Sequence, residues 1–490
     1  MGDHMPKHSR KPVIRSVKFN VVMNIILTAS GFLFPLITVP YVSRVLGPAN
    51  NGIVSWAFTF VSYFTLVAML GFNMYGTREC AKVRDDREQL STLAQELLII
   101  LMCSALIVYI AYIVFVLCLP QTRAQMPLMF IASVMIWLSA FGAEWFYRSI
   151  EQYEYITFRN IAFKLIALIL MFIFVRHTND YLVYAVINII GSAGSNVLNI
   201  LRIRTFVTFS RSYKMNFRRH FKGMFAFSIS GITAGMYSQI DMLLLGFFSS
   251  NFAMGLYQLV FKIRNLCTSA GSAVTTVMLP RLSYYESTGG NHDKTTDLMA
   301  KNLNFLLMLG LSIITALVIC AEPLISILGG SDYLGATPAL RISAPIVLIS
   351  SISAMLSQYM IAANHEKMLT ITNVVGLVLA IILECALIPF MGISGAALGL
   401  VITEVAVYAM RAYTLRDYMR QVHKHTDYGR IIIAWTVATA ATGGIFWLVH
   451  DFNPFLSIAV AAAVFVTVFG LLLMLFRETF IMSMMRRKRR

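Results

Sequence analysis

The chain has 490 residues, of which 58% are hydrophobic and only 13% are charged, and its mean hydropathy is +0.71. A soluble domain has about 45–50% apolar and about 25% charged residues, so this composition leaves too few polar side chains for a water-facing surface. It therefore excludes an ordinary soluble protein and predicts an all-α polytopic membrane protein. The net charge of +17 raises nucleic-acid binding as a second possibility.

The apolar residues are gathered in long runs. A helix needs about 20 predominantly apolar residues to cross the hydrocarbon core of a bilayer. By that measure the sequence predicts about 14 transmembrane helices. They lie near 19–43, 51–73, 93–119, 127–147, 158–176, 181–203, 223–249, 253–279, 301–321, 338–363, 369–389, 394–415, 431–450 and 455–476.

Basic residues set the expected orientation. With an even number of spans both termini lie on one side, and the loops of that side hold most of the Lys and Arg, including seven in segment 202–222. Cytoplasmic loops carry such an excess, so both termini are expected in the cytoplasm, in a bacterial cytoplasmic membrane. The same distribution accounts for most of the net charge, and no nucleic-acid partner is expected.

A weak internal repeat indicates two lobes. Thr157 and Asn160 at the start of span 5 recur as Thr370 and Asn373 at the start of span 11, although chance similarity between apolar helices is the alternative. Transporters built from such repeats bind substrate where the repeats meet. The expected organisation is a cytoplasmic N-terminal segment (1–18), an N-lobe of spans 1–6 (19–206), a basic linker (207–222), a C-lobe of spans 7–12 (223–415), spans 13 and 14 (431–476) and a basic tail (477–490).

Charged residues within the spans are the main candidates for a site, because each costs about 2.5–3.5 kcal/mol at the centre of a bilayer. Asp241 in span 7 and Lys262 in span 8 are equally far from the turn between these spans, so they are predicted to pair at one depth. The pair is either ion-responsive, beside a substrate cavity, or a structural bridge. Arg264 points about 200° away from Lys262 around the helix.

A second group lies at the cytoplasmic end of spans 4 and 5. Glu144 and Arg148 are spaced as an i,i+4 pair, and Lys164 follows in span 5. They are interpreted either as a basic vestibule for a phosphate headgroup or as a local salt bridge with a snorkelling lysine.

The predicted site therefore combines three sets of residues and has no catalytic or metal-binding member. The substrate-binding cations are Lys262, Arg264, Arg148, Lys164, Arg44 and Arg341. The ion-coupling acids are Asp241 and Glu144, with H⁺ or Na⁺ as the candidate ion and no other cofactor. The polar residues lining the cavity are Asn24, Thr28, Ser55, Thr59, Gln258 and Asn265.

Four segments resemble those of a known family: 40–52, 70–79, 145–157 and 279–283. Together they are similar to Wzx-type polysaccharide transporters of the MOP flippase superfamily, along nearly the whole chain. The resemblance implies a MATE-like fold of two pseudosymmetric six-helix lobes plus two C-terminal helices, with a cationic central cavity. It also implies alternating access that moves undecaprenyl-diphosphate-linked repeat units to the outer leaflet. Membrane lipids are expected partners, with polysaccharide polymerase and export machinery as further candidates.

Two other functions are alternatives to this interpretation. A MATE-type cation-coupled multidrug antiporter usually has twelve spans and prefers an acidic cavity. A membrane glycan polymerase or ligase is an enzyme and usually carries a sizeable extracytoplasmic loop, whereas no loop here exceeds roughly 25 residues. A transporter rather than an enzyme is therefore expected.

Overall fold

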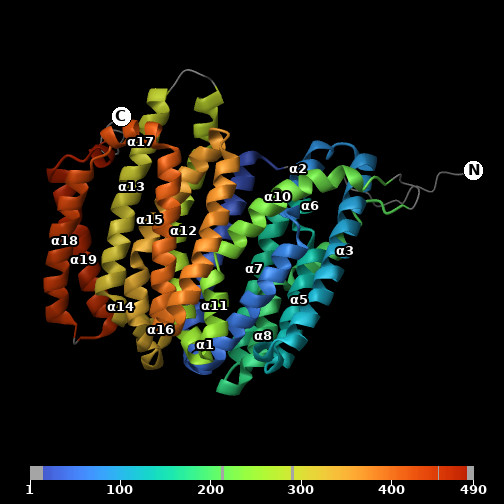
Figure 1. The fold of residues 1–490 in the computed structure, drawn as a ribbon, viewed down its shortest axis with the longest axis horizontal. Helices are drawn as coiled ribbons and strands as arrows, with labels where there is room; N and C mark the ends of the chain where they lie inside the picture. Colours follow the sequence, from blue (N-terminus) through green and yellow to red (C-terminus); the bar gives the residue numbers. More distant parts are fainter. Residues whose placement is uncertain (1–14, 211–214, 288–291, 451, 483–490) are drawn as a thin grey trace, which may run out of the picture. The chain divides into compact units, whose positions relative to one another are not determined.

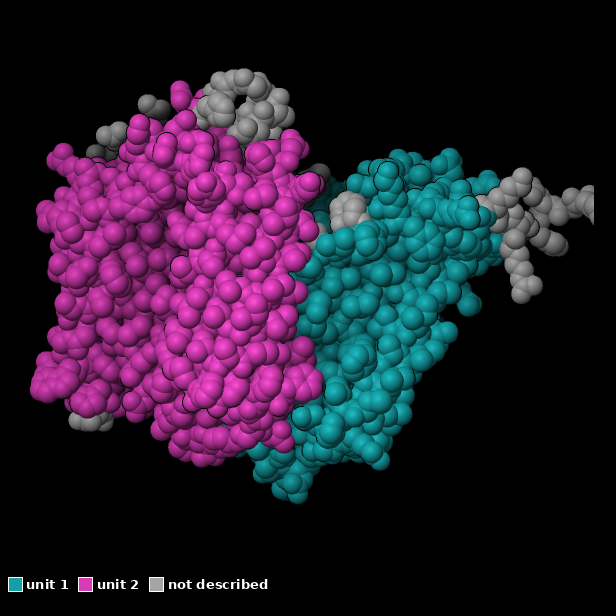
Figure 2. All heavy atoms as spheres, viewed as in Figure 1, with its two compact units in different colours: residues 1–239 teal, residues 240–490 magenta. Residues whose placement is uncertain are grey.

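The structure is a computed structural model that describes residues 15–210, 215–287, 292–450 and 452–482. All regular structure in these ranges is helical, and no strand occurs in them (Figure 1). The predicted terminal segments and the linker fall partly outside the described residues. The chain divides into two compact units, Met1–Gln239 and Ile240–Arg490 (Figure 2), and each is described by itself.

Unit 1 is built around its first helix. α1 packs against α3, α5, α7 and α10. It begins after Ser16, whose side chain accepts a hydrogen bond from the Phe19 amide and so caps the helix. The helices of unit 1 are α1 (Val17–Ala68), α2 (Phe72–Lys82), α3 (Arg87–Cys118), α4 (Pro120–Arg123), α5 (Met126–Gly142), α6 (Glu144–Ser149), α7 (Tyr153–Phe174), η1 (Thr178–Asp180), α8 (Tyr181–Ile189), η2 (Ile190–Gly194), α9 (Asn196–Ile203) and α10 (Arg218–Tyr237).

Unit 2 is built around α15, which packs against α12, α13 and α16. The last two helices, α18 and α19, pack on each other and reach α13 and α14. The helices of unit 2 are α11 (Ile240–Phe248), α12 (Asn251–Ser287), α13 (His292–Ile319), α14 (Ala321–Gly329), η3 (Ser331–Ala336), α15 (Thr337–Ala362), α16 (Glu366–Thr414), α17 (Arg416–Lys424), α18 (Tyr428–Val449) and α19 (Pro454–Leu475).

Two long helices each contain a sharp break at a glycine. Gly47 in α1 has φ +70°, and Gly392 in α16 has φ +56°. Only glycine adopts this backbone region without steric cost, so these positions are where a helix turns into the next. Predicted spans 1 and 2 meet at Gly47, and predicted spans 11 and 12 meet at Gly392.

The described part of the chain contains ten helical stretches long and apolar enough to cross a membrane. Two of them are the broken helices α1 and α16, each of which covers two predicted spans. Predicted spans 7 and 8 fall on α10, α11 and α12, which are not among the ten. Span 7 was expected to be continuous over 223–249, but the helix ends at Tyr237 and restarts at Ile240. The polytopic α-helical class is confirmed, while the count of fourteen stays a prediction.

The proposed repeat has a counterpart in hydrogen bonding. On α7, the Asn160 side-chain oxygen accepts a bond of 3.1 Å from the Ser195 hydroxyl, in the span that follows. On α16, the Asn373 side-chain oxygen accepts a bond of 2.7 Å from Arg411, beyond the break at Gly392. Each asparagine thus ties the start of one span to the later part of the next. The exact lobe boundaries stay a prediction.

Candidate functional site

A buried ion pair joins α11 to α12 in unit 2. Nη2 of Arg264 lies 2.9 Å from Oδ2 of Asp241, and their side chains are 4% and 1% exposed. The hydroxyl of Tyr257 donates to the same oxygen at 2.8 Å, and Nη1 of Arg264 lies 3.3 Å from that hydroxyl. The other Asp241 oxygen accepts from the Met242 amide. A charged pair this deeply buried needs such bonds, because desolvation otherwise exceeds the attraction between the charges.

The sequence of α12 explains this arrangement. Tyr257 and Arg264 are seven residues apart and therefore project from one face of the helix. Lys262 lies on another face, because it is two residues, or about 200°, from Arg264. The predicted pair of Asp241 with Lys262 is therefore wrong, because the face of α12 turned toward Asp241 is that of Arg264. The interpretation that Lys262 and Arg264 point in different directions agrees with the structure.

Glu384 on α16 is a second acid in this region. Its side chain is fully buried, and neither carboxylate oxygen has a hydrogen-bond partner among the described residues. It lies within electrostatic range of Asp241 and Arg264, and the backbone of Gly399 packs against its side chain. An ionised carboxylate without a partner is costly in such a place. The cluster of Asp241, Tyr257, Arg264 and Glu384 is called the α11–α12–α16 cluster below.

The remaining candidates on α12 lie outside this cluster. Lys262 is half-buried, and its ammonium has no partner among the described side chains. Gln258 is buried and its Oε1 has no partner in the same part of the chain, while Asn265 is exposed. Lys262 and Asn265 are therefore more accessible to a ligand than Arg264, whereas Gln258 is as buried as Arg264.

In unit 1 the predicted pair of Glu144 and Arg148 is confirmed. Oε1 of Glu144 accepts from Nη2 and Nε of Arg148 at 2.7 and 3.1 Å. Its other oxygen, Oε2, lies 3.3 Å from Nη2 of Arg159 on α7, whose side chain is 1% exposed. Arg159 also donates from Nη1 to the carbonyl of Ser195 at 3.1 Å and to Oδ1 of Asn196 at 2.9 Å. One carboxylate is therefore shared by two arginines.

Local backbone features hold this group in place. α5 ends at Gly142, and Ala143, with a left-handed φ of +43°, separates it from the short helix α6, which begins at Glu144. Asn196 donates to the carbonyl of Leu138, and Asn199 donates to that of Gly142, so α9 satisfies the carbonyls at the end of α5. These bonds fix the position of Glu144 relative to α7 and α9.

The other predicted cations are engaged elsewhere. Lys164 donates to the hydroxyl of Ser30 on α1 at 3.0 Å, which ties α7 to α1. Arg341 donates from Nε to the carbonyl of Val318 at 3.1 Å, near the end of α13. Arg44 is exposed, three residues before the break at Gly47. Their roles as substrate ligands stay predictions.

The four polar residues predicted along α1 are unevenly exposed. Asn24 and Thr28 are exposed, and the Thr28 hydroxyl donates to the Asn24 carbonyl. Ser55 is half-buried and Thr59 is buried. The exposed pair remains available to a ligand or to lipid.

A third charged group anchors the start of α10, and sequence reasoning missed it. The fully buried carboxylate of Glu96 accepts from the Asn216 amide at 2.6 Å and from Nε of Arg219 at 3.0 Å. Nε2 of His220 lies 2.7 Å from Glu96, and its Nδ1 lies 2.8 Å from the Tyr75 hydroxyl. An acid at a helix N-terminus suits the free amides there. Glu96 thus holds α10 against α2 and α3.

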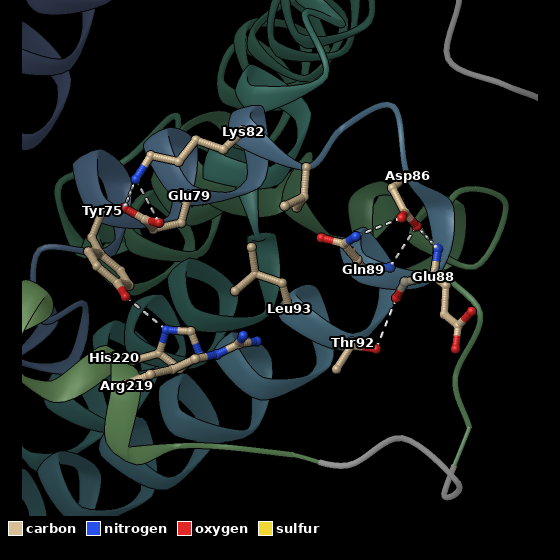
Figure 3. A pocket seen from close by; sticks show the side chains of 11 residues that line it. Tyr75, Glu79, Lys82, Asp86, Glu88, Gln89, Thr92, Leu93, Arg219 and His220 are labelled. Atoms are coloured by element: carbon tan, nitrogen blue, oxygen red, sulfur yellow. Dashed lines mark hydrogen bonds and ion pairs between the residues drawn. The ribbon is translucent and has the colours of Figure 1, made fainter.

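A cavity of about 510 Å³ opens beside this anchor (Figure 3). Its charged lining residues are Glu79, Lys82, Asp86, Glu88, Arg219 and His220. Glu79 pairs with Lys82 and Arg78, and Asp86 caps α3. Because both signs of charge are present and most are already paired, the lining does not select a ligand of one charge.

Comparison with known proteins identifies the family. The sequence profile described as "Polysaccharide biosynthesis protein" matches residues 17–286, more than half of the chain. The chain belongs to this family. Two relatives are named putative O-antigen transporters. The one from Escherichia coli K12 is 25% identical, and the alignment covers 82% of this chain and 97% of that relative. The one from Shigella dysenteriae is 23% identical. A probable low-salt glycan biosynthesis flippase of Haloferax volcanii is 20% identical over 41% of this chain and 42% of its own length.

Solved structures place the fold beside those of membrane transporters. The lipid II flippase MurJ aligns with a TM-score of 0.69 at 15% identity, covering 93% of this chain and 98% of that one. An inward-facing MATE multidrug transporter of the MOP superfamily aligns with a TM-score of 0.61 at 14% identity, covering 83% and 99%. The MATE/MOP-like fold and the multi-pass membrane class are confirmed. The named relatives are transporters and flippases, which confirms the expected class of transporter rather than enzyme.

The structure adds four functional candidates that the predicted site lacked: Arg159, Tyr257, Glu384 and Glu96. A buried charge within an apolar run was the signal available in the sequence for three of them. Which partner each would meet depended on helix rotation and on contacts between distant segments. That information is not present in the spacing of a single helix.

Proposed function

We propose that the chain is a flippase that moves undecaprenyl-diphosphate-linked oligosaccharide repeat units from the cytoplasmic to the outer leaflet by alternating access. The observation that carries the proposal is the family match together with a fold shared with a lipid II flippase. The relatives named as O-antigen transporters support export of a lipid-linked glycan for cell-surface polysaccharide. The membrane would be a bacterial cytoplasmic membrane, with both termini on the cytoplasmic side.

Cations within the helices suit such a substrate. A lipid diphosphate carries at least two negative charges, and one cation at 4 Å contributes about 4 kcal/mol at an effective dielectric constant of 20. Lys262 is half-buried and Arg148 is about half exposed, so both remain accessible to a ligand. By this proposal each of these cations is a candidate contact for the negatively charged diphosphate.

The α11–α12–α16 cluster is the proposed coupling site for H⁺ or Na⁺. Two acids, Asp241 and Glu384, lie almost fully buried there, and one of them has no hydrogen-bond partner in the described residues. Buried acids in membrane helices commonly mark ion pathways. Binding of a cation by Glu384 would relieve its cost and change the packing of α16 against α11.

A MATE-type multidrug antiporter is the second candidate, and the MATE structural matches support it. Those matches cover 83% of the chain, compared with 93% for the lipid II flippase. The wider coverage favours the flippase.

Cells that depend on this chain for surface glycan test the proposal. Lys262→Ala is expected to lower glycan export at an unchanged protein level, and Lys262→Arg is expected to retain more of it because the charge is kept. Normal export by Lys262→Ala would remove this residue from the substrate path. Loss of the chain without any loss of a surface glycan would contradict the flippase itself.

A further inference from the structure

The two arginines of unit 1 meet at one carboxylate. One carboxylate oxygen of Glu144 lies 2.7 Å from Arg148, and the other lies 3.3 Å from Arg159. Two cations are thus bound to the two oxygens of one carboxylate, with one negative charge between them. A phosphoryl group presents oxygens to arginine in the same forked manner, and such pairs are among the strongest charge-assisted hydrogen bonds.

Arg159 is the fixed member of the pair. Its side chain is 1% exposed and is held by the Ser195 carbonyl and the Asn196 side chain. Ser195 directly follows the π-helical turn η2, a type of irregularity often found at functional sites. The buried Nε of Arg159 has no hydrogen-bond partner among the described residues. Arg159 therefore has donor capacity that Glu144 does not use.

Glu144 and Arg148 are the movable members. Their side chains are 27% and 48% exposed, so each can turn toward the surface. When Glu144 leaves, the buried Arg159 keeps its bonds to Ser195 and Asn196. The backbone of α6 is held in place while these side chains move, because Trp145, Phe146 and Tyr147 of this helix are fully buried. The site thus combines a rigid frame with a carboxylate that is free to swing.

We propose that Glu144 occupies the place of the substrate's diphosphate and is displaced when the lipid-linked substrate binds to Arg148 and Arg159. This inference rests on the proposed function and assigns the headgroup to a particular site. In the empty protein the carboxylate bridges the two arginines and partly neutralises them. In the loaded protein a phosphoryl group takes both guanidinium groups, and the return of Glu144 helps to release the product.

Binding of undecaprenyl diphosphate to the purified full chain in nanodiscs tests this exchange. Glu144→Gln removes the competing charge with little change in shape and is expected to tighten binding about three- to tenfold. Arg148→Ala and Arg159→Lys are expected to weaken it. If the role of Glu144 is purely structural, Glu144→Gln should instead weaken binding, because loss of the salt bridges would disorder the site.

Glu151→Gln is the matched control. Glu151 lies two residues beyond the end of α6, where its carboxylate pairs with Arg84 at 2.5 Å and its side chain is 29% exposed. This variant is expected to bind the lipid diphosphate as the wild type does. Equal tightening by Glu151→Gln and Glu144→Gln would overturn the proposal, since it would reflect net charge alone. Unchanged or weaker binding by a Glu144→Gln protein with wild-type thermal stability would also overturn it.

Two further binding measurements distinguish the possible reasons for a negative result. Inorganic pyrophosphate is expected to compete only at concentrations far above that of the lipid. If it binds as tightly as undecaprenyl diphosphate, the assignment to a lipid headgroup is wrong. If the wild type binds no undecaprenyl diphosphate at all, the proposed function fails together with this site. If the wild type binds undecaprenyl diphosphate and Glu144→Gln does not change the affinity, only the proposed displacement of Glu144 is wrong, and the proposed function stands.

Discussion

Oδ2 of Asp241 accepts hydrogen bonds from both Arg264, at 2.9 Å, and the Tyr257 hydroxyl, at 2.8 Å. The three groups join α11 to two residues of α12 that lie about two helical turns apart. Because breaking a buried ion pair leaves one charge without a partner, this arrangement gives α11 and α12 one preferred packing. The same residues are therefore expected to affect stability before they affect transport.

Variants of this pair separate stability from substrate binding. Asp241→Asn and Arg264→Gln are each expected to destabilise the protein by about 3–5 kcal/mol. The double variant is expected to cost less than the sum, since neither charge is then left alone. Lys262→Ala is expected to cost less than about 1 kcal/mol, like most changes away from buried networks. Thermal unfolding in detergent measures all four. A larger loss for Lys262→Ala than for Arg264→Gln would contradict this assignment of the ion pair.

Glu384 is predicted to be uncharged in this conformation. Glu384→Gln replaces one uncharged polar group by another and is expected to change stability by less than about 1 kcal/mol. The groups that interact electrostatically with Glu384 are Asp241, Arg264 and Tyr257. If Glu384 carries the coupling cation, transport by the Gln variant no longer responds to an imposed proton or sodium gradient. Strong destabilisation of the Gln variant would show that an ionised Glu384 stabilises the fold, contrary to this account.

The Glu96 anchor is predicted to hold the start of α10. Glu96→Ala removes the shared acceptor of Asn216, Arg219 and His220, so hydrogen exchange in residues 216–224 is expected to accelerate at least about tenfold, equivalent to about 1.4 kcal/mol. Glu79→Gln is the control, because the partners of Glu79 are Arg78 and Lys82 on its own helix. Exchange that is equally fast in both variants would argue against a specific anchor.

The break in α1 offers a test of backbone strain that involves no packing. A Cβ added at Gly47 or at Gly31 would meet no atom within 4 Å, but only Gly47 has a left-handed φ, of +70°. Gly47→Ala is expected to lower stability by about 1 kcal/mol. Gly31→Ala, within a regular stretch of α1, is expected to be neutral or stabilising by up to about 1 kcal/mol. Thermal unfolding of the two variants provides the comparison, and equal effects would remove the role assigned to Gly47.

The fold class could be predicted from the sequence, because it follows from hydrophobicity alone. Apolar runs identified helices throughout, and the breaks at Gly47 and Gly392 fall between predicted spans. The interruption of span 7 after Tyr237 was not predicted. Residues 223–249 form one apolar run, and neither Ser238 nor Gln239 is a strong helix breaker. Its cause is tertiary, since α10 packs with unit 1 and α11 packs on α16.

The site was predictable only where partners are neighbours in sequence. Glu144 and Arg148 are four residues apart, and helix geometry alone brings them together. The partner of Asp241 depended on the rotation of α12, which depth along the helix does not specify. Glu96 and Arg159 meet partners 15 to 124 residues away. Such contacts arise from packing of distant segments, which a single sequence does not reveal.

Transfer of a lipid-linked glycan between leaflets by the purified chain tests the central claim most directly. The protein is placed in liposomes with a fluorescent undecaprenyl-diphosphate oligosaccharide, and a membrane-impermeant quencher reports which leaflet the glycan occupies. The account predicts transfer that depends on the protein, is reduced by Lys262→Ala and responds to a proton or sodium gradient. Absence of transfer for any glycan lipid, together with efflux of a cationic dye, would contradict the flippase and support the multidrug antiporter.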